Sequence, residues 1–248
     1  MSQISKSESL VLLKDDKEYY KGHGKNFLSN SDINALLRNP SSFGVDREDS
    51  KEMAQGRLFH QLMLEPDKAN TFHMIDASTR NTNKYIDYCK SVGISFCLLM
   101  HEVKSVHSWV NAMRSNIHFY DEIYKNGNKF EVPGISEIKG HMFKGKTDIE
   151  NSNYLPDLKT TTDINKFSKS GYIYNYDSQA YIYEQIFGKP VVFFVVDKET
   201  LQLGIFRPTK EFVASGERKV ERALSVYDKY FGLNKTEDII NHYIDAEI

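Results

Sequence analysis

The sequence has little cysteine and no zinc-binding histidine pattern, and these absences exclude two classes of metalloprotein. Only 2 of the 248 residues are cysteines. Cys89 and Cys97 do not form a Cys-x2-Cys pair, and two thiols cannot supply the ligands of a four-cysteine iron–sulfur cluster. The 8 histidines show neither His-x3-His nor His-Glu-x2-His spacing, which argues against a zinc hydrolase.

Charge and hydropathy exclude further classes. The 32 basic and 34 acidic residues leave a formal charge of −2, so any DNA-binding surface must be local. No stretch approaches the ~20 apolar residues of a membrane span, and no basic-plus-apolar signal segment opens the chain. We therefore expect a soluble, cytoplasmic protein with no membrane partner. No nucleophile elbow or glycine-rich phosphate loop is present, which disfavours a small-molecule hydrolase and a nucleotide cofactor.

What the sequence does contain is a candidate metal site in residues 145–160, which read as strand, turn, strand. If Ser152–Asn153 form the loop of a hairpin, Asp148 lies directly opposite Asp157, and strand alternation puts Lys159 on the same face. Like charges across a ladder are destabilising, so folding alone gives no reason for this pair. A divalent cation does, because carboxylates bind Mg²⁺ or Mn²⁺ and an ammonium stabilises a developing phosphorane. The alternative is a solvated hairpin tip with incidental charges.

Apolar periodicity and capping residues predict one α/β domain. Residues 1–26 are expected to form a flexible N-terminal arm, 27–232 the domain, and 233–248 a tail or short helix. The predicted helices cover about 29–38, 53–64, 83–93, 97–116, 164–187 and 209–230. The predicted strands cover about 130–132, 136–141, 143–150, 154–160, 191–196 and 201–207. The 191–196 run is apolar throughout, which is typical of a strand buried on both faces.

Four segments carry a pattern that extends beyond the two aspartates. They are Leu28-Ser29-Asn30-Ser31 with Asn39-Pro40, Gly56-x3-His60 ending in Leu64-Glu65-Pro66, Asp148 with Asp157-Leu158-Lys159, and Tyr176-x2-Gln179-Ala180-x2-Tyr183. Together they resemble the PD-(D/E)XK nuclease superfamily and, within it, the exonuclease VIII (RecE-type) group of phage and bacterial recombination exonucleases. The resemblance implies a restriction-endonuclease-like core, with a central mixed sheet flanked by helices, and Mg²⁺ or alternatively Mn²⁺ as the cofactor.

The resemblance also implies roles for the site residues. Asp148 is expected to be the bridging metal ligand and Asp157 a second carboxylate ligand, joined by the carbonyl of Leu158. His60 would deliver an imidazole ligand from its helix, although a helical histidine beside apolar residues is more often a packing residue. Lys159 would lie beside the attacking water.

Four further residues are candidates for accessory roles. Tyr176, Gln179 and Tyr183 can share one helix face, where an amide and a phenol can orient the catalytic lysine or a DNA phosphate. Core packing explains the tyrosines equally well, so Gln179 is the firmer catalytic candidate. Glu137 lies on the strand before the first aspartate and would approach the metal or brace its ligands, but an exposed strand glutamate is the simpler interpretation.

Candidate DNA contacts are distributed over two parts of the chain. Lys144 and Lys146 belong to a group of lysines around the proposed hairpin that can bind phosphates, although scattered lysines are usually a solvated face. Ser29, Ser31 and Arg57 are further candidates. Helix capping explains the serines as well, and a surface salt bridge explains the arginine.

The sequence therefore predicts a metal-dependent DNA exonuclease for recombination or phage DNA processing. Action from double-stranded ends in the 5′ to 3′ direction, a single-strand annealing partner, and a homo-oligomeric ring of roughly three or four chains rest on the resemblance. The alternatives are an endonuclease or repair nuclease with the same core, and a non-catalytic DNA-end-binding module.

Overall fold

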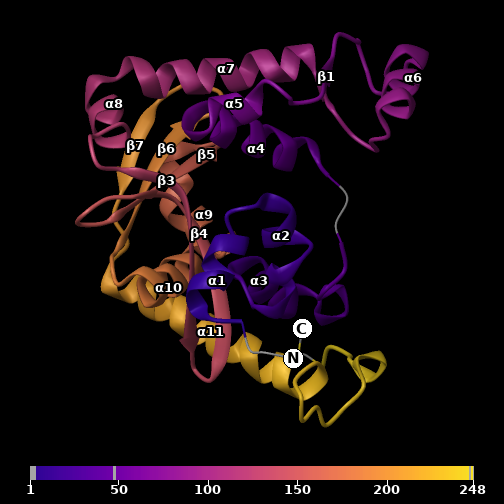
Figure 1. Ribbon diagram of the computed structural model, residues 1–248, viewed down its shortest axis with the longest axis vertical. Coiled ribbons are helices and arrows are strands. Elements are labelled where there is room, and N and C mark those ends of the chain that lie inside the picture. The colour runs from indigo at the N-terminus through magenta and orange to yellow at the C-terminus, as the bar shows by residue number, and fades with distance from the viewer. Residues whose placement is uncertain (1–3, 47–48, 246, 248) are drawn as a thin grey trace.

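The computed structural model describes residues 4–46, 49–245 and 247 (Figure 1). The helices are α1 (Lys6–Leu12), α2 (Asp16–Tyr20), α3 (Asn30–Arg38), α4 (Lys51–Leu64), α5 (Pro66–Ala69), α6 (Asn83–Val92), α7 (Met100–Ser115), α8 (Ile117–Ile123), α9 (Phe167–Ile173), α10 (Tyr176–Phe187) and α11 (Lys210–Tyr230). The strands are β1 (Met74–Ile75), β2 (Leu98–Leu99), β3 (Lys129–Ile138), β4 (His141–Glu150), β5 (Leu155–Thr161), β6 (Val191–Asp197) and β7 (Leu203–Phe206).

The fold is mixed α/β, but its strands form small sheets in place of the one central sheet expected. β3 and β4 form an antiparallel hairpin, β6 pairs with β5 in parallel and with β7 in antiparallel, and β1 pairs with β2. β4 packs beside β5 without a ladder between them. The predicted hairpin with Asp148 opposite Asp157 is therefore wrong. Its turn does form, because the side chain of Asn151 accepts hydrogen bonds from the backbone N–H groups of Asn153 and Tyr154.

The hairpin that does form turns at Lys139-Gly140, which the sequence interpretation missed. Ile138 pairs with His141, so the loop has two residues, and both have positive φ, 50° and 83°. Positive φ at both loop residues is characteristic of a type I′ turn, the turn whose twist matches two antiparallel strands.

Most predicted helices are confirmed, together with their caps. The Ser29 hydroxyl and backbone N–H donate to Asp32 at the start of α3, and Thr209 accepts the N–H of Phe212 at the start of α11. The single helix expected after β5 is instead broken at Asn175, whose φ of 58° is left-handed and separates α9 from α10.

β6 is the centre of the core. All of its residues are buried, as its apolar sequence predicted. Phe194 packs with Trp109 of α7 and Leu158 of β5 on one face, and Phe193 packs with Ala180 of α10 on the other. In Figure 1, α7 and α8 accordingly lie on one side of β5, β6 and β7, with α10 and α11 on the other.

A glycine pair lets α10 approach the β3–β4 hairpin. Gly134 and Gly145 are partners in the ladder. A Cβ at Gly134 would lie 2.4 Å from Ile186, and one at Gly145 would lie 2.9 Å from Tyr183. Any larger residue would push α10 away from β4, and α10 carries the candidate residue Gln179.

The N-terminal segment is not the loosely held arm that was expected at 1–26. Its described residues 4–26 include α1 and α2, and Leu13 and Tyr19 pack with Ile135 of β3. The Lys144 ammonium donates to the carbonyl of Tyr19 at 2.6 Å. Burial and this bond attach the segment to the hairpin.

The C-terminal segment has one short element, a 3-10 turn at Ile239–Asn241, within its described residues. Among the described helices, none combines the length and the apolar composition that crossing a membrane requires.

Candidate metal centre

Three side chains from one helix and the hairpin converge beside β5. His60 of α4, Glu131 of β3 and Asp148 of β4 each offer one ligand atom, and these atoms all lie within 4.8 Å of one another. The Nδ1 atom of His60 is 3.3 Å from Oδ1 of Asp148. His60 and Asp148 were predicted from the sequence, whereas Glu131 was not.

Glu131 reaches this cluster because of the hairpin register. Phe130 pairs with Ile149 and Val132 with Thr147, so Glu131 stands level with Asp148. Its φ of 51° is left-handed, which is strained for a residue with a side chain. Two acidic residues facing each other across a ladder are also destabilising, so the arrangement is better explained by a ligand than by folding.

A second group joins the first through β5. The Lys159 ammonium forms an ion pair with Oδ2 of Asp157, and the amide of Gln179 donates to Oδ1 of Asp157 at 2.7 Å. The backbone N–H of Leu158 donates to Oδ2 of Asp148 at 2.7 Å. Adjacent residues of one strand thus connect the two aspartates, although no ladder places them opposite each other.

Burial disfavours the ionised form of the carboxyls in the site, and the basic groups beside them offset this effect only in part. Burial raises the pKa of Glu131 to about 8, with the charge of Asp148 adding to the effect. Burial also raises the pKa of Asp157 to about 6 against the attraction of Lys159. For Asp148, burial acts in the same direction, but His60, Lys159 and the N–H of Leu158 bring its pKa below the ordinary value.

The carboxylates of the site raise the pKa of both basic side chains. Burial lowers the pKa of Lys159, but the carboxylates of Asp157 and Asp148 outweigh it, and the net pKa is raised. The net pKa of His60 is raised because Asp148 outweighs burial in the same way. Lys159 is therefore an ammonium near neutral pH, suited to donating hydrogen bonds and unsuited to acting as a general base.

The residues present fit a divalent cation. Oδ2 of Asp157 is buried and, within the described part of the chain, has no hydrogen bond of good geometry, although Lys159 lies beside it. His60, Glu131 and Asp148 offer one imidazole and two carboxylates, a set that Mn²⁺ accepts and whose oxygens suit Mg²⁺.

The other candidates for accessory roles lie at different distances from the cluster and have different partners. Lys159 lies over the ring of Tyr176, with Nζ 5.0 Å from the ring centre. The Tyr183 hydroxyl donates to the carbonyl of Lys146 at 2.8 Å, so it braces β4. Glu137 is exposed and pairs with Met142 next to the hairpin turn, outside the cluster.

The candidate DNA contacts have other partners. Ser29 caps α3, and the Ser31 hydroxyl is 3.2 Å from the hydroxyl of Ser29. Arg57 donates to Asp49 at 2.7 Å.

Lys144 and Lys146 are buried under the N-terminal segment and do not form the exposed phosphate-binding surface that was expected. The ammonium of Lys146 lies 2.7 Å from Oδ1 of Asp16. The ammonium of Lys144 donates to the carbonyl of Tyr19, so both lysines attach residues 4–26 to the hairpin.

Comparison with known proteins agrees with this architecture. Residues 30–236 match the family described as a PDDEXK-like domain of unknown function (DUF3799). The search of curated proteins found no match to this sequence.

Two of the solved structures that are similar to the chain are described as exonucleases. One, described as a "putative exonuclease" from Eubacterium rectale, is 16% identical with a TM-score of 0.62, and the alignment covers 94% of this chain and 95% of that one. The other, described as a phage related exonuclease from Haemophilus somnus 129PT, is 12% identical with a TM-score of 0.35. The alignment covers 82% of this chain and 94% of that one. At these identities, the first match supports a shared fold.

Proposed function

Because the chain belongs to the family of PDDEXK-like domains, we propose that it is a metal-dependent nuclease that hydrolyses phosphodiester bonds of DNA. One observation carries the proposal. The ligand atoms of His60, Glu131 and Asp148 lie within 4.8 Å of one another, beside the buried pair of Asp157 and Lys159. A binding module needs DNA contacts, but it has no need of a buried cluster of carboxylates.

His60, Glu131 and Asp148 would hold the cation, with Asp157 as an additional carboxylate beside them. A divalent cation bound there supplies positive charge to the phosphate oxygens and the leaving alkoxide. The ammonium of Lys159 would orient the attacking water and stabilise the negative charge that develops on the phosphoryl oxygens.

Two contacts hold the acidic groups in place for this chemistry. The amide of Gln179 fixes one oxygen of Asp157, and the backbone N–H of Leu158 fixes one oxygen of Asp148. Both donors come from regular elements with buried packing, so the carboxylates lose little freedom when a substrate binds.

Within this class, we favour an exonuclease that acts on double-stranded ends in the 5′ to 3′ direction during recombination or phage DNA processing. The fold match to a protein described as a "putative exonuclease" supports this choice over an endonuclease or repair nuclease. A homo-oligomeric ring of roughly three or four chains and a single-strand annealing partner belong to the same proposal.

End-labelled linear DNA and closed circular DNA, each incubated with Mg²⁺, Mn²⁺ or EDTA, test the proposal. We expect linear duplex to be degraded with either metal, with no cleavage in EDTA and intact circles throughout. Cleavage of closed circles would favour the endonuclease, and binding without cleavage would favour the non-catalytic module. Light scattering tests the ring, which a monomer would contradict.

A further inference from the structure

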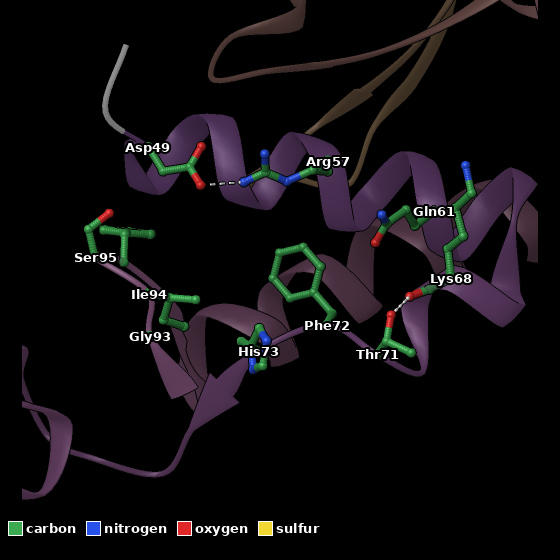
Figure 2. Close-up of a pocket in the computed structure, with 11 residues that line it drawn as sticks. Asp49, Arg57, Gln61, Lys68, Thr71, Phe72, His73, Gly93, Ile94 and Ser95 are labelled. Atoms are coloured by element: carbon green, nitrogen blue, oxygen red, sulfur yellow. Dashed lines mark hydrogen bonds and ion pairs between the residues drawn. The ribbon is translucent and has the colours of Figure 1, made fainter. Parts of the chain in front are cut away.

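A polar pocket lies along α4, next to the face that carries His60. It is lined by Arg57 and Gln61 of α4, by the Phe72–His73 segment, and by the loop at 93–96 (Figure 2). Its volume is about 410 Å³. Binding sites for small ligands have roughly 300–1,000 Å³, so this pocket, hereafter the α4 pocket, has room for a nucleotide.

The α4 pocket contains an unsatisfied acceptor. Oε1 of Gln61 is buried and has no hydrogen-bond partner among the residues that the structure describes. Buried polar atoms in native proteins are nearly always paired, and an unpaired one is costly. An N–H group of a bound ligand would satisfy this oxygen, and every base presents such a group on its pairing edge.

An aromatic ring and a guanidinium complete the site. In Figure 2, Phe72 lies near the middle of the pocket, between α4 and the loop that contains residues 93–95. Its ring also packs against the core. The guanidinium of Arg80 covers the Phe96 ring at 4.6 Å from its centre, and the His73 ring packs edge-on against Tyr88, so we assign the stacking role to Phe72.

Arg57 is the cation of the pocket. Its side chain is 47% exposed and, among the residues that the structure describes, forms an ion pair with Asp49 alone, which is 34% exposed. Exposed ion pairs contribute little to stability, so a phosphate can replace this carboxylate. The Lys68 ammonium is paired with Asp16 and Glu65 and points away from the pocket in Figure 2.

Helix geometry connects the pocket to the metal centre. Arg57 and Gln61 are four residues apart and therefore share a face, while His60 is one residue from Gln61, or ~100° around the helix. Arg57 is three residues before His60, or ~60° around the helix, so a DNA strand at the metal centre would lie beside Arg57.

We propose that the α4 pocket binds an unpaired nucleotide of the DNA strand that occupies the metal centre. Its phosphate binds Arg57, its base stacks on Phe72, and an N–H of the base bonds to Gln61. The base must be unpaired because a base inside a duplex has both faces covered by its neighbours. The inference rests on the proposed nuclease function, because it takes its ligand from the same strand.

Fluorescence anisotropy with a short labelled oligothymidylate in EDTA tests this proposal without any cleavage. We expect Arg57→Ala and Phe72→Leu each to weaken binding about tenfold, since one phosphate contact or one stacked base is lost. Asp49→Asn should tighten binding several-fold because it removes the carboxylate that competes for Arg57. Arg222→Ala, at an exposed position of α11, is the matched control for the loss of one positive charge and should bind like the wild type.

Equal binding by Arg57→Ala, Phe72→Leu and Arg222→Ala would overturn the proposal. Equal losses by Phe72→Leu on the oligothymidylate and on a duplex whose terminal base pairs are cross-linked would also overturn it, because a cross-linked end has no unpaired base to stack. A thermal melting curve checks whether the Phe72→Leu variant is folded. The binding measurement does not depend on catalysis, so an inactive protein that shows these losses would contradict the nuclease function and leave the pocket in place.

Discussion

Two buried aspartates near α10 differ in how completely their charge is compensated. Asp177, which is 0% exposed, accepts hydrogen bonds from the N–H of Ser178 and the hydroxyl of Ser215, and pairs with the ammonium of Lys219 at 2.9 Å. Within the part of the chain that the structure describes, one oxygen of Asp157, which is 1% exposed, accepts a hydrogen bond from the amide of Gln179. Its other oxygen forms an ion pair with Lys159 but has no hydrogen bond of good geometry.

The difference separates a structural charge from a functional one. Asp177 joins the start of α10 to α11, and its partners compensate its negative charge within the fold. Asp157 belongs to a group with Glu131 and Asp148, and burial raises the pKa of two of these three carboxyls. His60 lies beside Asp148 and Lys159 beside Asp157, so two basic side chains face three carboxyls, and we infer that a bound cation supplies the missing positive charge.

The largest expected effect is the loss of catalysis in Asp148→Asn. This change keeps an acceptor for the N–H of Leu158 but removes the charge that binds the cation, and we expect turnover to fall by about a thousandfold or more. The melting temperature should change little, because the lost attraction to His60 and Lys159 is offset by the lost repulsion from Glu131 and Asp157. Single-turnover cleavage and thermal melting measure the two quantities, and near-normal turnover in Mg²⁺ would rule out this centre.

Lys159→Ala should have the next largest effect. Loss of one transition-state contact lowers the rate by roughly a hundredfold, while DNA affinity changes little. Single-turnover cleavage at saturating enzyme measures the rate, and fluorescence anisotropy measures the DNA affinity, so the two effects can be told apart. An equal loss of binding would assign Lys159 to phosphate positioning.

Asp177→Asn is the counterpart on the structural side. It leaves Lys219 without its carboxylate, and we expect the free energy of unfolding to fall by about 2 kcal/mol. The folded fraction should keep normal turnover, which urea unfolding and an activity assay at low temperature can check together. A stable but inactive variant would remove the contrast between the two aspartates.

The smallest effect is expected for His60→Ala. Carboxylates remain to hold the cation, so turnover in Mg²⁺ should fall by about tenfold. High Mn²⁺ should restore part of it, since Mg²⁺ demands a near-ideal ligand geometry. An unchanged dependence on the two metals would leave His60 as a packing residue.

The sequence predicted much of the fold because its local signals are strong. Caps at Ser29 and Thr209, the glycine after α10 and the apolar run of β6 each specify an element by its own residues. The pairing of strands is not local, and the polar turn at Asn151–Asn153 was mistaken for a hairpin loop although it joins two strands without a ladder.

The same error explains what was missed at the site. The two-residue turn at Lys139-Gly140 determines which residue faces Asp148, and counting back from it gives Glu131, not Glu137. His60 was identified through a motif, which does not depend on register. Asp148 was first identified from a hairpin register that does not form, but the motif that contains it supported it as well. The partners of Lys144 and Lys146 could not be found in this way, because they lie more than a hundred residues earlier in the chain.

Isothermal titration of Mn²⁺ into the DNA-free protein tests the central claim most directly, using Glu131→Gln and Glu137→Gln as a matched pair on one strand. The wild type and Glu137→Gln should bind Mn²⁺ with the same affinity. Glu131→Gln should bind Mn²⁺ with an affinity lower by about tenfold or more, because one ligand has lost its charge. Binding by Glu131→Gln as tight as that of the wild type would contradict a metal centre formed by His60, Glu131 and Asp148.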